Sequence, residues 1–161
     1  MNYGWEFHHL MNAIAQGEQS PLAIDTVLAK KAEVYNRGYF MNFLTNHDEN
    51  SWQGTIEERM GDAADAMAVL AFTLDGMPLM YSGQEAGLDR SLKFFEKDEI
   101  EWWDHENADI YKTLFKLKKN NRALWNGKWG GEMIRITNDH PDQVLPFYRE
   151  SEGDKMISII N

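Results

Sequence analysis

The stretch that decides the fold reads YFMNFLTNHDEN and covers residues 39–50. Its apolar half, 39–44, is continuous rather than alternating, which is typical of a parallel strand covered on both faces. It stops at Asn46, His47 and Asp48, so a buried strand is predicted to deliver an imidazole and a carboxylate to its carboxyl end. Parallel α/β barrels build their active sites in this way. Taken alone, the tripeptide would more often be a polar turn after a strand.

A second apolar segment, GMPLMYSGQEAG at residues 76–87, follows after one amphipathic helix. The helix is predicted to begin near Glu57 and to end at Gly76, because its apolar residues recur along one face. A strand is predicted over 77–81, with Pro78 near its start, where a missing N–H is tolerated. Strands alternating with helices in this order indicate a parallel α/β architecture.

Other segments follow the same logic of periodicity and turn residues. Apolar residues at helical spacing predict helices over 7–16, about 22–36 and 108–120. A polar loop is expected over 49–55 and a long charged loop over 82–107.

The composition changes after Asn126, where three glycines follow within five residues. Short strands are predicted at 133–137, 144–149 and 155–160, separated by turn-forming residues. The last of them has no later partner and would present an edge that invites pairing with another chain.

Composition narrows the class of protein. The length of 161 residues predicts one domain or slightly more, and 43% hydrophobic residues indicate a packed core. The formal charge of −10 disfavours nucleic acid and anionic membranes as partners, whereas a neutral glycan feels no repulsion. There is no cysteine for a disulfide or a thiolate zinc site. Neither a membrane span nor an export signal is evident, which leaves localisation open.

The two apolar segments resemble the last two barrel strands of the alpha-amylase family of glycoside hydrolases. Residues 43–48, FLTNHD, match the pattern Phe-x-x-Asn-His-Asp of the seventh strand. Residues 76–87 match Gly-x-Pro-x-x-Tyr-x-Gly-x-Glu-x-Gly of the eighth strand in register. The segment YGWEFHH at 3–9 resembles the region after the sixth strand. KFFEKDEIEW at 93–102 resembles the region after the eighth in amylases of gut Bacteroidetes type.

The resemblance implies an α/β fold: a partial TIM (β/α)8 barrel comprising its last two to three β/α units. Residues 1–126 would form this carboxyl-terminal portion of the barrel, and 127–161 the start of a truncated antiparallel β domain. Since a whole barrel needs about 250 residues, the chain is expected to be a fragment clipped at both ends. No cofactor is identified in the chain, although a full-length parent could bind calcium and could be periplasmic or extracellular.

The resemblance also implies roles for particular residues. Asp48 would be the third acid of the family, which grips two hydroxyls of the sugar at the cleavage point and favours a distorted ring. His47 would donate a hydrogen bond to the same hydroxyls, and Asn46 would also bind substrate. Tyr81 and Glu85 would be structural residues near the site, with Glu85 accepting backbone N–H bonds.

Retaining glycoside hydrolysis needs a nucleophile and a general acid about 5 to 5.5 Å apart. In this family they lie on the fourth and fifth strands, and no residue here matches those motifs; Glu101, Asp104 and Glu106 lack the flanking pattern. The chain is therefore expected to be a fragment of a retaining hydrolase that cleaves α-1,4-glucosidic bonds of starch or malto-oligosaccharides, and to be inactive by itself.

The alternatives are a non-catalytic glycan-binding or interaction module of the same fold and an unrelated α/β binding domain. The expected partner is an α-glucan, not nucleic acid or a membrane, and exposed edges could lead to self-association.

Two further groups of residues carry weaker signals. Large aromatic residues could stack on glucose rings or simply pack in loops; they are Trp5, Trp52, Trp102 and Trp103. Adjacent histidines on a helix point in different directions, so His8 and His9 are not expected to bind metal. The decisive geometric expectation is that positions 47 and 48 emerge from a strand tip on the same side as Glu85. Tips on opposite sides, or the first tip inside a helix, would contradict the sugar site.

Overall fold

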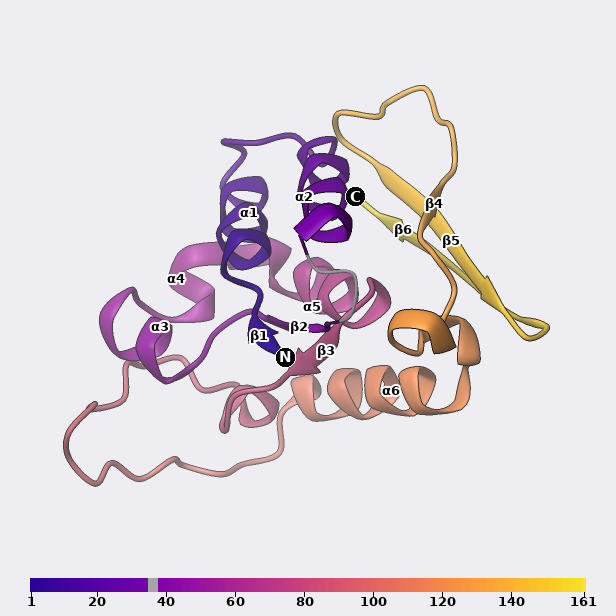
Figure 1. Ribbon diagram of the computed structural model, residues 1–161. Coiled ribbons are helices and arrows are strands. Elements are labelled where there is room, and N and C mark those ends of the chain that lie inside the picture. Colours follow the sequence, from indigo (N-terminus) through magenta and orange to yellow (C-terminus); the bar gives the residue numbers. More distant parts are fainter. Residues whose placement is uncertain (35–37) are drawn as a thin grey trace.

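The computed structural model describes residues 1–34 and 38–161 (Figure 1). A parallel sheet at its centre has the strand order β1-β2-β3, formed by β1 (Asn2–Tyr3), β2 (Phe40–Phe43) and β3 (Met77–Leu79). The register pairs Tyr3 with Met41, and Met41 in turn with Met77. The expected parallel α/β arrangement is confirmed. The sequence analysis missed β1, because two residues are too few for a periodic pattern.

Helices connect and cover these strands (Figure 1). Between β1 and β2 lie α1 (Trp5–Ala15) and α2 (Ala23–Val34), close to the predicted ranges. The end of the second helix, predicted near residue 36, lies outside the described residues. After β3 the chain forms the short 3-10 helix η2 (Gln84–Ala86), a long irregular loop and α6 (Glu106–Asn120).

Two expectations about the segment between β2 and β3 were wrong. The predicted polar loop over 49–55 contains most of a helix, α3 (His47–Trp52). The single helix predicted from Glu57 is divided into α4 (Ile56–Met60), a 3-10 turn and α5 (Ala64–Thr73). The break falls at Gly61, whose φ of 47° leaves the helical region while the apolar periodicity continues past it.

An antiparallel sheet with the order β4-β5-β6 lies at one side of the molecule (Figure 1). Its strands are β4 (Ile134–Arg135), β5 (Leu145–Ser151) and β6 (Asp154–Ile160), in good agreement with the three predicted segments. A two-residue turn joins β5 to β6, and both of its residues have positive φ: 50° at Glu152 and 85° at Gly153. Positive φ at both positions matches the twist of a hairpin.

A single hydrophobic core is shared by the helices around the parallel sheet and by the antiparallel sheet. It contains residues of α1, α5, β5 and β6, among them Met11, Leu70, Leu145, Phe147 and Met156. The domain division proposed at 126/127 separates the parallel from the antiparallel part, but the core crosses it, and the division stays a prediction.

The fully buried Arg149 of β5 joins the antiparallel sheet to the rest of the chain. Its guanidinium donates to the carbonyl oxygens of Thr73 at 2.9 Å, Trp125 at 2.9 Å and Gly131 at 2.7 Å. Burial lowers the pKa of Arg149, and the nearby carboxylate of Asp75 opposes this. The first of these bonds satisfies a carbonyl at the end of α5, which a helix cannot satisfy internally.

Among the helices that the structure describes, none has the length and apolar character needed to cross a membrane.

Candidate functional site

The candidate site lies where β2 and β3 end. Because the two strands are parallel neighbours, their carboxyl ends meet at the same edge of the sheet. The chain therefore leads from Phe43 to His47 and from Leu79 to Glu85 on one side of the molecule. The expectation that the two tips face the same side is confirmed.

The expectation that the strand itself presents His47 and Asp48 was wrong. Both residues lie in the first turn of α3, which begins at His47, four residues after β2 ends at Phe43. By the criterion set out from the sequence, this departure counts against the sugar site. However, α3 starts so soon after β2 that its first turn still lies at the carboxyl edge of the sheet.

Asn46 explains why the helix starts there. Its backbone is extended (φ −149°), and its side-chain Oδ1 accepts the N–H groups of Asp48 and Glu49, both at 2.9 Å. This is a helix N-cap, a position that asparagine favours. The residue is only 2% exposed, and its Nδ2 has no hydrogen-bond partner among the described residues. The sequence analysis did not identify Asn46 as a helix cap. The predicted contact of Asn46 with substrate stays a prediction.

His47 and Asp48 are accessible to a ligand. Their side chains are 54% and 47% exposed, and His47 Nε2 lies 3.6 Å from Asp48 Oδ1. A carboxylate and an imidazole held side by side can accept and donate hydrogen bonds to neighbouring hydroxyl groups. The arrangement is therefore suited to a polyhydroxylated ligand.

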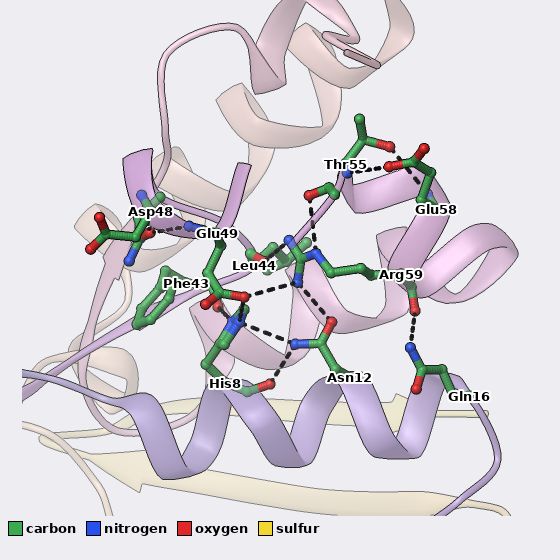
Figure 2. Close-up of polar contacts among 12 residues, drawn as sticks. His8, Asn12, Gln16, Phe43, Leu44, Asp48, Glu49, Thr55, Glu58 and Arg59 are labelled. Atoms are coloured by element: carbon green, nitrogen blue, oxygen red, sulfur yellow. Dashed lines mark hydrogen bonds and ion pairs between the residues drawn. The ribbon is translucent and has the colours of Figure 1, made fainter. Parts of the chain in front are cut away.

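Glu49, the residue after Asp48, belongs to a polar network with His8, Asn12 and Arg59, which we call the His8 network (Figure 2); Asn12 is half-buried and the other three are buried. His8 Nε2 lies 2.9 Å from Glu49 Oε2, and its Nδ1 lies 3.1 Å from the carbonyl oxygen of Phe43. Arg59 donates to Asn12 Oδ1 at 2.7 Å and to the carbonyl oxygen of Leu44 at 2.9 Å. The network thus ties α1, the end of β2, α3 and α4 together.

Burial controls the charges of this network. Desolvation lowers the pKa of His8, and the hydrogen bond and charge of Glu49 oppose that shift. Desolvation likewise lowers the pKa of Arg59, again opposed by Glu49, whose Oε2 lies 3.9 Å from Arg59 Nη1. Glu49 is next to Asp48 in the sequence, so its buried carboxylate fixes the helix turn that carries the exposed one.

The sequence analysis missed this network. His8 was considered only as a metal ligand, and Glu49 was placed in a loop. The two residues are 41 positions apart, so no local pattern connects them. Among the residues that the structure describes, no group of three or more His, Asp or Glu side chains could hold a metal ion.

Tyr81 and Glu85 lie just beyond β3. The backbone N–H of Gly83 donates to Glu85 Oε2 at 3.0 Å, and that of Tyr81 donates to Gln84 Oε1 at 2.7 Å. Burial raises the pKa of the half-buried Tyr81. The bond to Glu85 is of the kind expected for a structural carboxylate, although the role itself stays a prediction.

A hollow of about 610 Å³ lies beside this region, between the α4–α5 segment and the loop after β3. Its lining includes Glu57, Asp65, Gln84, His105 and Tyr111, but neither His47 nor Asp48. The candidate site is thus an open surface at the sheet edge rather than an enclosed hollow.

The structure is similar throughout to solved (β/α)8 barrel proteins. The noncanonic maltogenic alpha-amylase AmyB from Thermotoga neapolitana superposes with a TM-score of 0.81 at 22% identity, over 99% of this chain and 37% of that one. A cyclic alpha-maltosyl-(1→6)-maltose hydrolase from Arthrobacter globiformis, in complex with that sugar, gives 0.75 at 22% identity, over 98% and 36%. A cyclomaltodextrinase gives 0.77 at 21% identity, over 98% and 27%. These similarities show the fold, part of an alpha-amylase barrel followed by an antiparallel sheet.

Sequence comparison defines the family. Residues 1–132 match the model of the alpha-amylase catalytic domain. Alpha-amylase 2 of Dictyoglomus thermophilum is 25% identical over 134 residues, which is 75% of this chain and 22% of that protein. Alpha-amylase MalA of Haloarcula japonica is 29% identical over 126 residues, which is 76% of this chain and 18% of that protein. The chain belongs to the alpha-amylase family of glycoside hydrolases and spans about a fifth of the length of these relatives. The likeness to Bacteroidetes-type amylases stays a prediction.

Proposed function

We propose that this chain supplies the transition-state-stabilising carboxylate, Asp48, of a retaining α-glucan hydrolase. The observation that carries the proposal is the exposed pair of Asp48 and His47, 3.6 Å apart, at the carboxyl edge of the parallel sheet. Glycoside cleavage passes through an oxocarbenium-like transition state, and hydrogen bonds to sugar hydroxyls strengthen as it forms. Asp48 would accept such bonds and His47 would donate one. Several structural relatives are named for maltose-based substrates, which supports an α-glucan as the ligand.

Under this proposal the chain supplies one of the three catalytic carboxylates, so it cannot carry out the whole reaction. The nucleophile and the general acid have no counterpart that we can match here, so the 161-residue polypeptide is expected not to hydrolyse α-1,4-glucosidic bonds. The test incubates the pure chain with maltoheptaose and follows the release of shorter sugars. Turnover that disappears in Asp48→Ala would overturn the expectation of inactivity.

A second experiment tests the role of Asp48 itself. A polypeptide carrying the first five β/α units of a related amylase is added in trans, and starch hydrolysis is measured. Restored activity that is lost with Asp48→Asn, and retained with Glu18→Gln in an exposed turn, would support the proposal. Equal restored activity with Asp48→Asn would contradict it.

The alternative is a module that binds glycan without cleaving it, and one observation favours it. Exposed aromatic rings stand next to the candidate site, including Trp52 at 60% exposure. Maltoheptaose binding by the chain, with no hydrolysis even after addition of the missing barrel units, would favour this alternative.

A further inference from the structure

Three aromatic side chains form an exposed cluster beside His47, and we call it the aromatic platform. Trp52 ends α3, while Phe94 and Phe95 belong to the long loop after β3. Their residues are 60%, 38% and 85% exposed, respectively. Ring centroids lie 5.4 Å apart for Trp52 and Phe94, and 4.8 Å apart for Phe94 and Phe95. Phe94 also stacks on the ring of His47 at 5.8 Å, which makes the platform continuous with the candidate site.

The platform is held in place by hydrogen bonds from α3. The side chain of Asn50, which is 3% exposed, accepts the N–H of Leu92 at 2.8 Å and donates to the carbonyl oxygen of Arg90 at 3.1 Å. Ser51 Oγ donates to the carbonyl oxygen of Leu92 at 2.7 Å. The same helix that presents His47 therefore fixes the start of the loop that carries Phe94 and Phe95.

An ion pair braces the loop on its far side. Arg90 donates to both carboxylate oxygens of Asp98, at 2.8 and 3.0 Å, and Lys93 N–H donates to Asp98 at 3.0 Å. These bonds lower the pKa of Asp98 to about 2, with the Arg90 hydrogen bond as the main cause. The loop is thus closed from residue 90 to 98, with the two phenylalanines inside the closed stretch.

The exposure of these three rings indicates that they bind another molecule. Aromatic side chains bury a large apolar area when they find one, and a patch of them kept in water beside a cleft or site marks a binding surface. A pyranose ring has an apolar face of C–H groups and a polar rim of hydroxyls, so it can lie on an aromatic ring while its rim bonds to His47 and Asp48. The exposed carboxylate of Asp48 disfavours an anionic partner, while Glu96 and Glu99 of the loop are each paired with a lysine, Lys93 and Lys97, at 2.9 Å.

We propose that Trp52, Phe94 and Phe95 bind a glucosyl unit of a neutral α-glucan next to the unit held at Asp48. The assignment rests on the proposed function of that site. Sequence reasoning had named Trp52 as one of four aromatic candidates and had not considered the two phenylalanines. The structure brings them together with His47.

The test measures binding of maltoheptaose to the intact chain by calorimetry and by NMR of the indole N–H groups. We expect saturable binding that shifts the Trp52 resonance, identified by its loss in Trp52→Phe. Phe95→Ala and Trp52→Ala should each weaken binding by about fivefold or more, whereas Trp52→Phe should largely retain it. Trp129→Ala, an equally exposed tryptophan at 59%, should change nothing. Unfolding midpoints in urea check that each variant is folded.

The outcomes separate this proposal from the proposed function. Loss of affinity in Phe95→Ala but not in Asp48→Ala would support the platform and show that Asp48 does not hold the ground-state sugar, leaving its transition-state role to the experiment in trans. Loss in Asp48→Ala alone would contradict the platform and leave the Asp48 site standing. Absence of binding up to about 10 mM, or equal affinity for the β-linked cellohexaose, would overturn the assignment. If the platform variants alter only self-association in sedimentation experiments, the surface is a contact between copies and the proposal is wrong.

Discussion

At the scale of single residues, Glu49 shows how a buried carboxylate supports an exposed one. It is the acceptor next to His8 at 2.9 Å and near Arg59 at 3.9 Å, and all three side chains are at most about one-tenth exposed. Removing one member of a buried charged network leaves the others without compensation.

We therefore predict that Glu49→Ala lowers the free energy of unfolding by about 3 kcal/mol. Glu49→Gln keeps an acceptor for the network and should cost less. Urea denaturation followed by circular dichroism measures both. Glu18→Ala, which removes an exposed carboxylate, serves as the control and should have little effect. A loss as small as that of the control would show that the network contributes little to stability.

Much of the candidate site could be predicted from residue identity, because Asn46, His47 and Asp48 are consecutive in a recognisable pattern. The partners that hold them could not. His8 and Arg59 come from other helices, and only the folded chain brings them to Glu49. The cap by Asn46 escaped notice because the residue was interpreted as a sugar ligand.

At the scale of elements, periodic segments were predicted well and short ones poorly. The range of α6 and those of β5 and β6 agree with the sequence to within two residues. A six-residue helix such as α3 leaves too few residues for periodicity, and its start depends on a cap rather than on an apolar face. The break between α4 and α5 requires the positive φ of Gly61, which no hydrophobic pattern reveals.

Arg149 gives a prediction about how the antiparallel sheet is attached. Arg149→Met leaves the carbonyl oxygens of Thr73, Trp125 and Gly131 without their donor. We expect a loss of about 3 to 5 kcal/mol in the free energy of unfolding, because three buried acceptors lose their bonds at once. The exposed Arg122→Met is the control. Hydrogen exchange that stays unchanged in α5 of Arg149→Met would contradict this account.

The lowered pKa of Lys118 in α6 leads us to predict that the free energy of unfolding depends on pH. Its Nζ donates to the carbonyl oxygen of Leu124 at 2.8 Å, and burial lowers its pKa from 10.5 to about 8. Between these two values the unfolded chain binds more protons than the folded chain, so stability should rise with pH.

The rise should amount to about 3 kcal/mol and be absent in Lys118→Met. Urea denaturation at several values between pH 7.5 and 10.5 measures it, and the difference between chains isolates Lys118 from other groups that titrate there. Lys116→Met on the exposed face of α6 should keep the wild-type slope. The same slope in both variants would show that Lys118 is not the cause.

At the scale of the whole molecule, the parallel sheet has two open edges. In the described part of the chain, β1 and β3 each pair with β2 alone. An apolar hollow of about 380 Å³ lies beside β1 and is lined by residues that include Tyr3, Trp5, Val27 and Leu74. Unpaired strand edges next to apolar surface favour association between chains.

We predict that the pure chain self-associates as its concentration rises, which sedimentation velocity would reveal. Met77→Lys places a charge on the β3 edge, where Met77 is already 40% exposed, and should reduce the association. Ile157→Lys in β6 tests whether the antiparallel sheet contributes instead. A monomer at all concentrations would contradict the prediction.

The position of Arg149 in the chain has a consequence for synthesis on the ribosome. Its acceptor at the end of α5 lies 76 residues earlier. At about 5 to 20 residues per second, translation takes roughly 4 to 15 s to cover that distance. During this interval the carbonyl oxygen of Thr73 in the nascent α5 is left to water, because the arginine that will bond it has not yet been synthesised. Chaperone occupancy on the growing polypeptide should therefore persist until β5 has left the exit tunnel.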